Sequence, residues 1–112
     1  MARRFRPDPW AVEIAEEYAR RIRHLPVCSV VLFGSRARGE AEPDSDIDVM
    51  VVVSEETGEL SKVLLDIAYD LSCERGCWLV PAICPEKEVE GPPGKYDPFY
   101  RNVRKEGIPV VG

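Results

Sequence analysis

Two aspartates separated by a single residue, Asp46 and Asp48, stand at the start of the apolar run 47–53. In an extended chain the side chains at positions i and i+2 project from the same face, so both carboxylates point the same way. Two neighbouring anions repel each other, and a cation between them relieves that repulsion. Mg²⁺ typically takes one or two carboxylates and completes its shell with water and substrate phosphates. The pair therefore predicts a Mg²⁺ site that receives a phosphorylated ligand.

A polar segment that follows the apolar run 27–33 offers donors for such a phosphate. Gly34 has no Cβ, so a ligand can approach the backbone closely, and the Ser35 hydroxyl is a donor of the kind that cradles phosphate oxygens. Arg36 and Arg38 follow at once, and guanidinium groups match phosphate geometry in a bidentate way. We expect these donors and the aspartates to meet at one edge of a sheet if the two strands are neighbours.

Each of these side chains also has a structural interpretation. The aspartates could cap a turn, and Arg36 suits a solvated loop as well as it suits a triphosphate. Arg38 has acidic loop neighbours and small flanking residues, so we expect Arg38→Ala to lower stability more than Arg36→Ala. Ser45 could bond local backbone instead of substrate.

The hydrophobic pattern predicts the elements that would position these residues. Asp8 and Pro9 resemble a helix N-cap and first helical position, and apolar residues then recur at helical spacing up to Pro26. β-branched runs predict strands, and Gly76 is a plausible helix C-cap. The further predicted elements are strands at 27–33 and 47–53, a helix over 60–71 ending near Gly76, a strand at 77–84, a long loop at 86–98, a short helix at 99–105 and a terminal strand or tail at 108–111.

These elements follow the order α-β-β-α-β-α over a single domain, residues 1–112. We expect an α/β fold with a small mixed sheet of three or four strands packed by helices. The strand at 47–53 is apolar on both faces beyond its aspartates, so we expect it to be covered on both sides. Pro81 indicates that the strand at 77–84 lies at a sheet edge or is irregular.

The segment Gly-Ser-Arg-Ala-Arg-Gly at 34–39, taken with Ser-Asp-Ile-Asp at 45–48, resembles the signature of the polymerase beta-like nucleotidyltransferase superfamily. The closest likeness is to its minimal members, the small prokaryotic MNT proteins, and the ending at 97–107 looks like theirs. The resemblance implies the polymerase beta-like nucleotidyltransferase fold and Mg²⁺ held by the catalytic residues Asp46 and Asp48. It also implies a nucleoside triphosphate, with ATP favoured, bound by Gly34, Ser35, Arg36, Arg38 and Ser45.

The reaction that the resemblance implies is transfer of a nucleotidyl group, AMP from ATP, to a hydroxyl acceptor. Minimal members are often paired with a helical HEPN protein, as an antitoxin beside its toxin, so a tyrosine of that partner is a candidate acceptor. Competent relatives usually carry a third acidic residue on the strand after the intervening helix, and the strand at 77–84 has none. The alternatives nearby are Asp66, Asp70, Glu86 and Glu88. A second hypothesis is therefore a catalytically impaired nucleotide-binding module that acts through a partner, and a third is a structural adaptor.

Composition narrows the class of protein. The net charge of −5, from 15 basic and 20 acidic residues, is unlike the basic surface of a general nucleic-acid binder, so nucleic acid is not expected as a partner. No apolar run approaches the ~20 residues of a membrane span, and no signal-peptide core follows the basic N-terminus, which predicts a cytoplasmic protein. The four cysteines lack zinc-site spacing, and we expect them to be buried free thiols.

Overall fold

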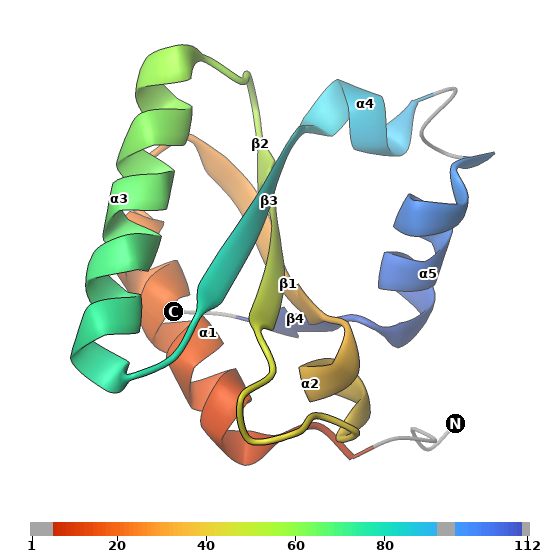
Figure 1. Ribbon diagram of the computed structural model, residues 1–112. Coiled ribbons are helices and arrows are strands. Elements are labelled where there is room, and N and C mark those ends of the chain that lie inside the picture. The colour runs from red at the N-terminus through yellow and green to blue at the C-terminus, as the bar shows by residue number, and fades with distance from the viewer. Residues whose placement is uncertain (1–5, 92–95, 111–112) are drawn as a thin grey trace.

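The computed structural model describes residues 6–91 and 96–110. The predicted order of helices and strands is observed, with two further short helices, and the segment predicted as a terminal strand or tail forms a fourth strand (Figure 1). The last residue of the predicted terminal strand and residues 92–95 of the predicted loop lie outside the described ranges. The elements are α1 (Pro9–Ile22), β1 (Val27–Phe33), α2 (Ser35–Arg38), β2 (Ile47–Val53), α3 (Gly58–Arg75), β3 (Leu79–Pro85), α4 (Glu86–Glu90), α5 (Pro98–Glu106) and β4 (Ile108–Val110).

Local capping signals set the limits of the long helices. Asp8 caps α1, because its Oδ1 accepts the backbone N–H two residues on at 3.0 Å, and Pro9 takes the first helical position. Thr57 caps α3 in the same way, with its hydroxyl oxygen accepting a backbone N–H at 3.1 Å. The helix ends at Gly76, whose φ of 65° is the left-handed conformation of a C-cap glycine and whose N–H donates to the Ser72 carbonyl.

The four strands form one mixed sheet in the order β3-β2-β1-β4. β1 runs antiparallel to β2 and β4, whereas β2 and β3 are parallel. The register places Phe33 of β1 and Val80 of β3 on either side of Asp48. The Ile47 N–H donates to the Trp78 carbonyl at 2.7 Å. Because the backbone N–H and C=O groups of alternate residues point to opposite sides of a strand, those of Val80 also face β2, whereas the backbone of Pro81 faces outwards. Pro81 therefore occupies an edge strand, which is the first of the two predicted alternatives, at a position where its missing N–H breaks no ladder bond.

Helices cover the two faces of the sheet unequally. α1 and α3 pack on one face and form the larger core with the odd-numbered residues of β2, while α4 and α5 cover part of the other face (Figure 1). Every β2 residue except Asp48 is buried, which confirms that this strand is covered on both sides. Asp48 is half-buried on the α4/α5 face, in line with Met50 and Val52.

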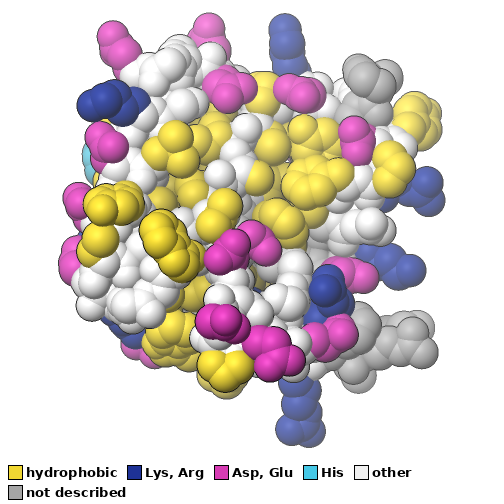
Figure 2. Space-filling model, in the orientation of Figure 1, with side chains coloured by type: hydrophobic (Ala, Val, Ile, Leu, Met, Phe, Trp, Pro, Cys, Tyr) yellow, Lys and Arg dark blue, Asp and Glu magenta, His cyan; other side chains and the backbone are white. Residues whose placement is uncertain are grey.

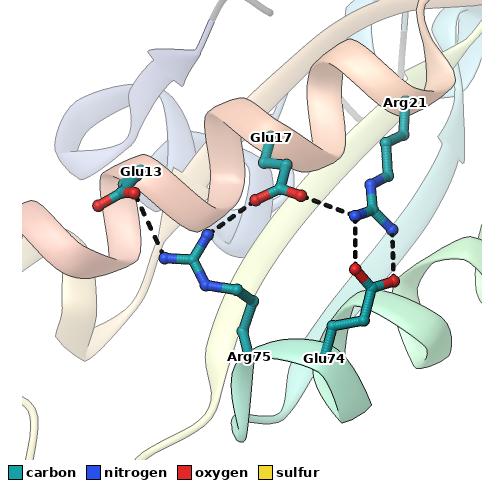
Figure 3. A network of polar contacts seen from close by, with 5 residues as sticks. All are labelled: Glu13, Glu17, Arg21, Glu74 and Arg75. Atoms are coloured by element: carbon teal, nitrogen blue, oxygen red, sulfur yellow. Dashed lines mark hydrogen bonds and ion pairs between the residues drawn. The ribbon is translucent and has the colours of Figure 1, made fainter.

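A network of ion pairs joins α1 to α3 (Figure 3). The two terminal nitrogens of Arg21 donate to the two carboxylate oxygens of Glu74, each at 2.9 Å, and one of them also donates to Glu17 at 2.7 Å. Arg75 reaches back from α3 to Glu17 at 2.7 Å and to Glu13 at 3.3 Å. The guanidinium of Arg21 lowers the pKa of Glu74. The network fixes α1 against α3 on the face away from the aspartates.

Three local predictions are wrong. The polar segment after β1 forms the helical turn α2 instead of a loop, and residues 86–90 form α4. The single apolar residue of α4, Val89, is buried against the α5 side of the sheet, which fixes a helix too short to show periodicity. Of the four free cysteines only Cys84 is buried, while Cys28 and Cys73 are exposed. Within the described residues, no helix is long and apolar enough to span a bilayer.

Candidate functional site

The pairing of β1 with β2 brings the glycine-serine turn against the aspartates. Because Phe33 pairs with Asp48, the chain leaves β1 at Gly34 directly beside that carboxylate. Gly34 has φ 77° and ψ −158°, a conformation that is essentially restricted to glycine. A Cβ on Gly34 would lie 2.8 Å from Asp48 Oδ2, so a side chain there would displace the carboxylate. The expectation that the two motifs meet at one sheet edge is confirmed.

The two carboxylates differ in exposure. Asp46 is exposed in the loop end before β2, whereas Asp48 is half-buried on the strand itself. Burial raises the pKa of Asp48, and the negative charge of Asp46 raises it further. A bound cation would favour the ionised form of Asp48.

The donor set at this position fits Mg²⁺ in company with a phosphorylated ligand. Within residues 6–91 and 96–110, no group of three or more His, Cys, Asp or Glu side chains gathers as an all-protein cage. Two adjacent carboxylates with open positions for water and phosphate oxygens are the arrangement in which Mg²⁺ is usually bound. The hydroxyl of Ser35, half-exposed beside Gly34, makes no hydrogen bond with any described residue and is open to such a ligand.

No third carboxylate stands beside the pair on β3. Val80 occupies the position in register with Asp48 and points to the same face. Asp66 and Asp70 are exposed on α3, which packs on the opposite face of the sheet. The acidic residues of α4 follow the far end of β3, roughly 20 Å along the strand from Asp48 at ~3.3 Å per residue. Among the described residues, none of the four alternatives considered from the sequence reaches the site.

Arg36 is a buried structural residue, and its burial favours the reverse of the predicted order, in which Arg38 contributes more to stability. The Arg36 side chain is 6% exposed, and one terminal nitrogen pairs with Asp8 Oδ2 at 2.6 Å. The other donates to the carbonyl oxygens of Pro43 at 3.2 Å and Ser45 at 2.8 Å, and the guanidinium lies 5.3 Å from the Trp10 ring centroid. Its Nε is buried and has no hydrogen-bond partner among the residues that the structure describes. Arg36 therefore ties the start of α1 to the loop that delivers Asp46.

Arg38 and Ser45 have different surroundings. The Arg38 side chain is 31% exposed and forms ion pairs with Glu40 at 2.9 Å and Glu106 at 3.1 Å. The Ser45 hydroxyl oxygen accepts the Glu42 N–H at 2.9 Å, which is the local backbone bond that the sequence left open. Arg38 remains accessible to a ligand, whereas the Ser45 hydroxyl already supports its own loop.

A cavity of about 150 Å³ opens beside Gly34 on the β1 side of the aspartates. The rings of Phe33 and Phe99 meet edge to face there, with centroids 5.5 Å apart. The α5 residues that line this cavity were not predicted from the sequence, because their proximity to Gly34 comes from the packing of α5 on β1. The cavity is lined by Phe33, Gly34, Arg38, Phe99, Asn102, Val103 and Glu106.

Comparison with known proteins gives one family and several structures of the same fold. The chain matches the model of the nucleotidyltransferase domain family over residues 13–97. No curated protein matches it. A protein from Sulfolobus solfataricus classed as a nucleotidyltransferase is 20% identical, with a TM-score of 0.54 over 89% of this chain and 78% of that one. A toxin-antitoxin structure with AMP-PNP is 17% identical, with a TM-score of 0.59 over 87% of this chain and 73% of that one. These likenesses show a common fold.

Proposed function

Because the chain belongs to the nucleotidyltransferase domain family, we propose that it is a Mg²⁺-dependent transferase that moves a nucleotidyl group, AMP from ATP, to a hydroxyl acceptor. The observation that carries this proposal is the contact between the two halves of the motif. Gly34 is held in a conformation restricted to glycine, and it lies so close to Asp48 that a Cβ would collide with the carboxylate. A turn that only ended a strand would have no need of this approach.

Each side chain has a distinct part in the proposed site. Asp46 and Asp48 would hold Mg²⁺, which when bound supplies charge neutralisation on the phosphates and a template for in-line attack. The backbone at Gly34 and the Ser35 hydroxyl orient the triphosphate, and Arg38 lies within the same wall. Arg36 acts indirectly. Its hydrogen bond to the Ser45 carbonyl holds the loop just before Asp46 and so positions the Asp46 carboxylate.

The proposed step is a displacement at the α-phosphorus. The acceptor oxygen forms a bond to this phosphorus, the bond to the oxygen bridging the α- and β-phosphates breaks, and pyrophosphate leaves with the electron pair. The proton of the acceptor hydroxyl passes to water, since Val80 and not a carboxylate stands beside Asp48 on β3. Positioning and electrostatic stabilisation would carry the catalysis, and the lack of a general base would slow it by about 10²–10⁴-fold.

The proposed acceptor is a tyrosine of a helical HEPN toxin, to which this chain would be the antitoxin. Support comes from the resemblance of the motif to minimal nucleotidyltransferases and from the fold shared with a toxin-antitoxin structure solved with AMP-PNP. The apolar residue in place of a third acid favours one competing function. In that alternative the chain binds nucleotide without turnover and acts through its partner.

Substitution of the two carboxylates tests the proposal. Asp46→Asn and Asp48→Asn, singly and together, are expected to abolish Mg²⁺-dependent ATP binding in calorimetry while the thermal melt shows a folded protein. Asp66→Asn is the matched control, because it removes the same charge from an exposed position on α3 and should leave binding unchanged. Chelation of Mg²⁺ with EDTA should reproduce the double substitution.

Tight Mg²⁺-ATP binding by the double variant would refute the assignment of the site. Incubation with α-labelled ATP and the protein encoded beside this gene separates the two functions. Label on that protein supports transfer, whereas nucleotide binding without label supports the alternative.

A further inference from the structure

Large apolar side chains are exposed on the β3 side of the candidate site. Leu65 and Tyr69 of α3 are 49% and 61% exposed, Trp78 just before β3 is 63% exposed, and Val80 is 41% exposed. We refer to these four residues as the edge surface. Figure 2 shows hydrophobic side chains over α3 and β3 on the side toward the viewer. Contiguous apolar surface of this kind on a small protein is typical of an interaction site.

The edge surface is continuous. Leu65 and Tyr69 are four residues apart on α3, so their side chains are neighbours on one side of the helix. Tyr69 and Trp78 line one cavity of about 310 Å³, and Val80 follows two residues later on the strand.

The edge surface also reaches the two carboxylates. The Trp78 carbonyl accepts the Ile47 N–H at 2.7 Å, between the two aspartates in sequence, and Val80 is in register with Asp48. The cavity beside Gly34 lies on the other side of Asp48, because β1 and β3 flank β2 on opposite sides. A nucleotide on the β1 side and a second molecule on the edge surface would therefore meet at the carboxylates.

The charges around the edge surface favour one class of second molecule. Asp66 and Asp70 project from α3, and β3 carries no charged residue. Of the two cations of α3, Lys62 lies with its Nζ 3.6 Å from Asp66 and offsets that charge in part, whereas Arg75 bonds carboxylates of α1. Lys and Arg side chains in Figure 2 gather instead over α5. An apolar surface bordered by carboxylates repels nucleic-acid phosphates and attracts apolar side chains flanked by Lys or Arg.

Pairing of a further strand onto β3 is disfavoured. Along β3, the backbone groups of alternate residues face away from β2, and Pro81 and Pro85 are two of these residues. Neither has an N–H to donate to an added strand. The occupant must therefore be held by side chains, with Trp78 and Tyr69 as aromatic anchors of the kind that dominate protein interfaces.

We propose that the edge surface is the docking site for the acceptor, and that the acceptor is a protein segment with apolar side chains flanked by basic residues. This inference rests on the proposed function, since it names the molecule that approaches the same site. Trp78 acts here as a positioning residue for the acceptor and takes no part in nucleotide binding.

Synthetic peptides that each contain one tyrosine test the inference. One combines Leu with Lys, a second replaces Lys by Glu, a third replaces Leu by Ser, and a short single-stranded DNA is the fourth probe. The indole N–H signal of Trp78 in a ¹H–¹⁵N spectrum, assigned through Trp78→Phe, reports binding without requiring turnover. The Leu-Lys peptide should shift this signal at the lowest concentration, while the Trp10 indole stays unchanged. Trp78→Ser and Tyr69→Ser should each weaken peptide binding by roughly 10-fold or more.

Two controls separate the docking surface from the nucleotide site. Tyr96→Ser removes a similarly exposed aromatic residue near α5 and should leave peptide binding unchanged. Trp78→Ser should leave the Kd for Mg²⁺-ATP unchanged, and where label transfer is measurable it should raise KM for the peptide with little change in kcat. Failure of wild-type protein to bind Mg²⁺-ATP counts against the proposed function alone. Equal binding of all peptides, preference for the DNA, or an unmoved Trp78 signal would overturn the inference.

Discussion

Replacement of Arg36 by Ala should destabilise this protein far more than the same change at Arg38. The Arg36 guanidinium is buried, and it provides an ion pair to Asp8, bonds to two loop carbonyls and a contact over Trp10. Removal of one partner of a buried ion pair costs about 3–5 kcal/mol. The Asp8 side chain is 23% exposed and regains some hydration, so we take the lower end, about 3 kcal/mol.

The loss of stability that we expect for Arg38→Ala is small. Its partners Glu40 and Glu106 have side chains that are 58% and 31% exposed, and exposed ion pairs contribute about 1 kcal/mol or less. For a chain of this length, 1 kcal/mol corresponds to about 3–6 °C in Tm. Arg36→Ala should therefore lower Tm by roughly 10–15 °C, and Arg38→Ala by less than about 5 °C.

Differential scanning calorimetry without nucleotide measures both variants directly. Arg36→Lys is the informative third variant, because an ammonium group can pair with Asp8 but cannot also bond two carbonyls with a planar fork. It should fall between wild type and Arg36→Ala. Equal losses in Tm for Arg36→Ala and Arg38→Ala, or a larger loss for Arg38→Ala, would show that the buried ion pair does not support the fold as argued.

Two further predictions concern the turn at Gly34 and the ion pairs that join α1 to α3. Gly34→Ala should cost about 1–3 kcal/mol and abolish Mg²⁺-ATP binding in calorimetry, because the new Cβ strains the backbone and meets Asp48. Gly76→Ala, at φ 65° with open space around it, should cost about 1–2 kcal/mol and leave binding intact; equal affinities for the two variants would contradict the collision. Glu17→Ala removes a carboxylate shared by two arginines and should lower the free energy of unfolding by about 1 kcal/mol in urea titration, with Glu16→Ala near zero. A Glu17→Ala variant as stable as the Glu16→Ala control would show that the ion pairs between α1 and α3 contribute nothing to stability.

Much of the fold could be predicted because its elements are long enough to carry a pattern. The β-branched runs of β1 and β2 fix both strands to the residue, and Asp8, Pro9 and Gly76 mark helix ends through their own backbone chemistry. The short helices could not be found in this way. α2 and α4 have four and five residues, less than two turns, so their formation depends on packing and not on periodicity.

The site was predicted unevenly for a related reason. The meeting of Gly34 with Asp48 follows from the pairing of adjacent strands, which the sequence order favours. The sequence favoured Arg38 as the structural arginine because its acidic neighbours are close in the chain, whereas the partner of Arg36 lies 28 residues away. The carbonyl oxygens that also accept hydrogen bonds from Arg36 belong to the backbone, so no residue type in the sequence indicates them. The cavity wall from α5 was missed because it depends on tertiary packing alone.

The position of Asp8 has a practical consequence for work with this protein. Its one carboxylate caps α1 through Oδ1 and holds Arg36 through Oδ2, while its backbone N–H donates to the Arg36 carbonyl at 2.9 Å. The chain that enters α1 is therefore a mechanical support for the loop before Asp46. A substitution or truncation that alters Asp8 would therefore disturb both the start of α1 and the loop before Asp46, and variants for quantitative nucleotide titrations should keep this residue.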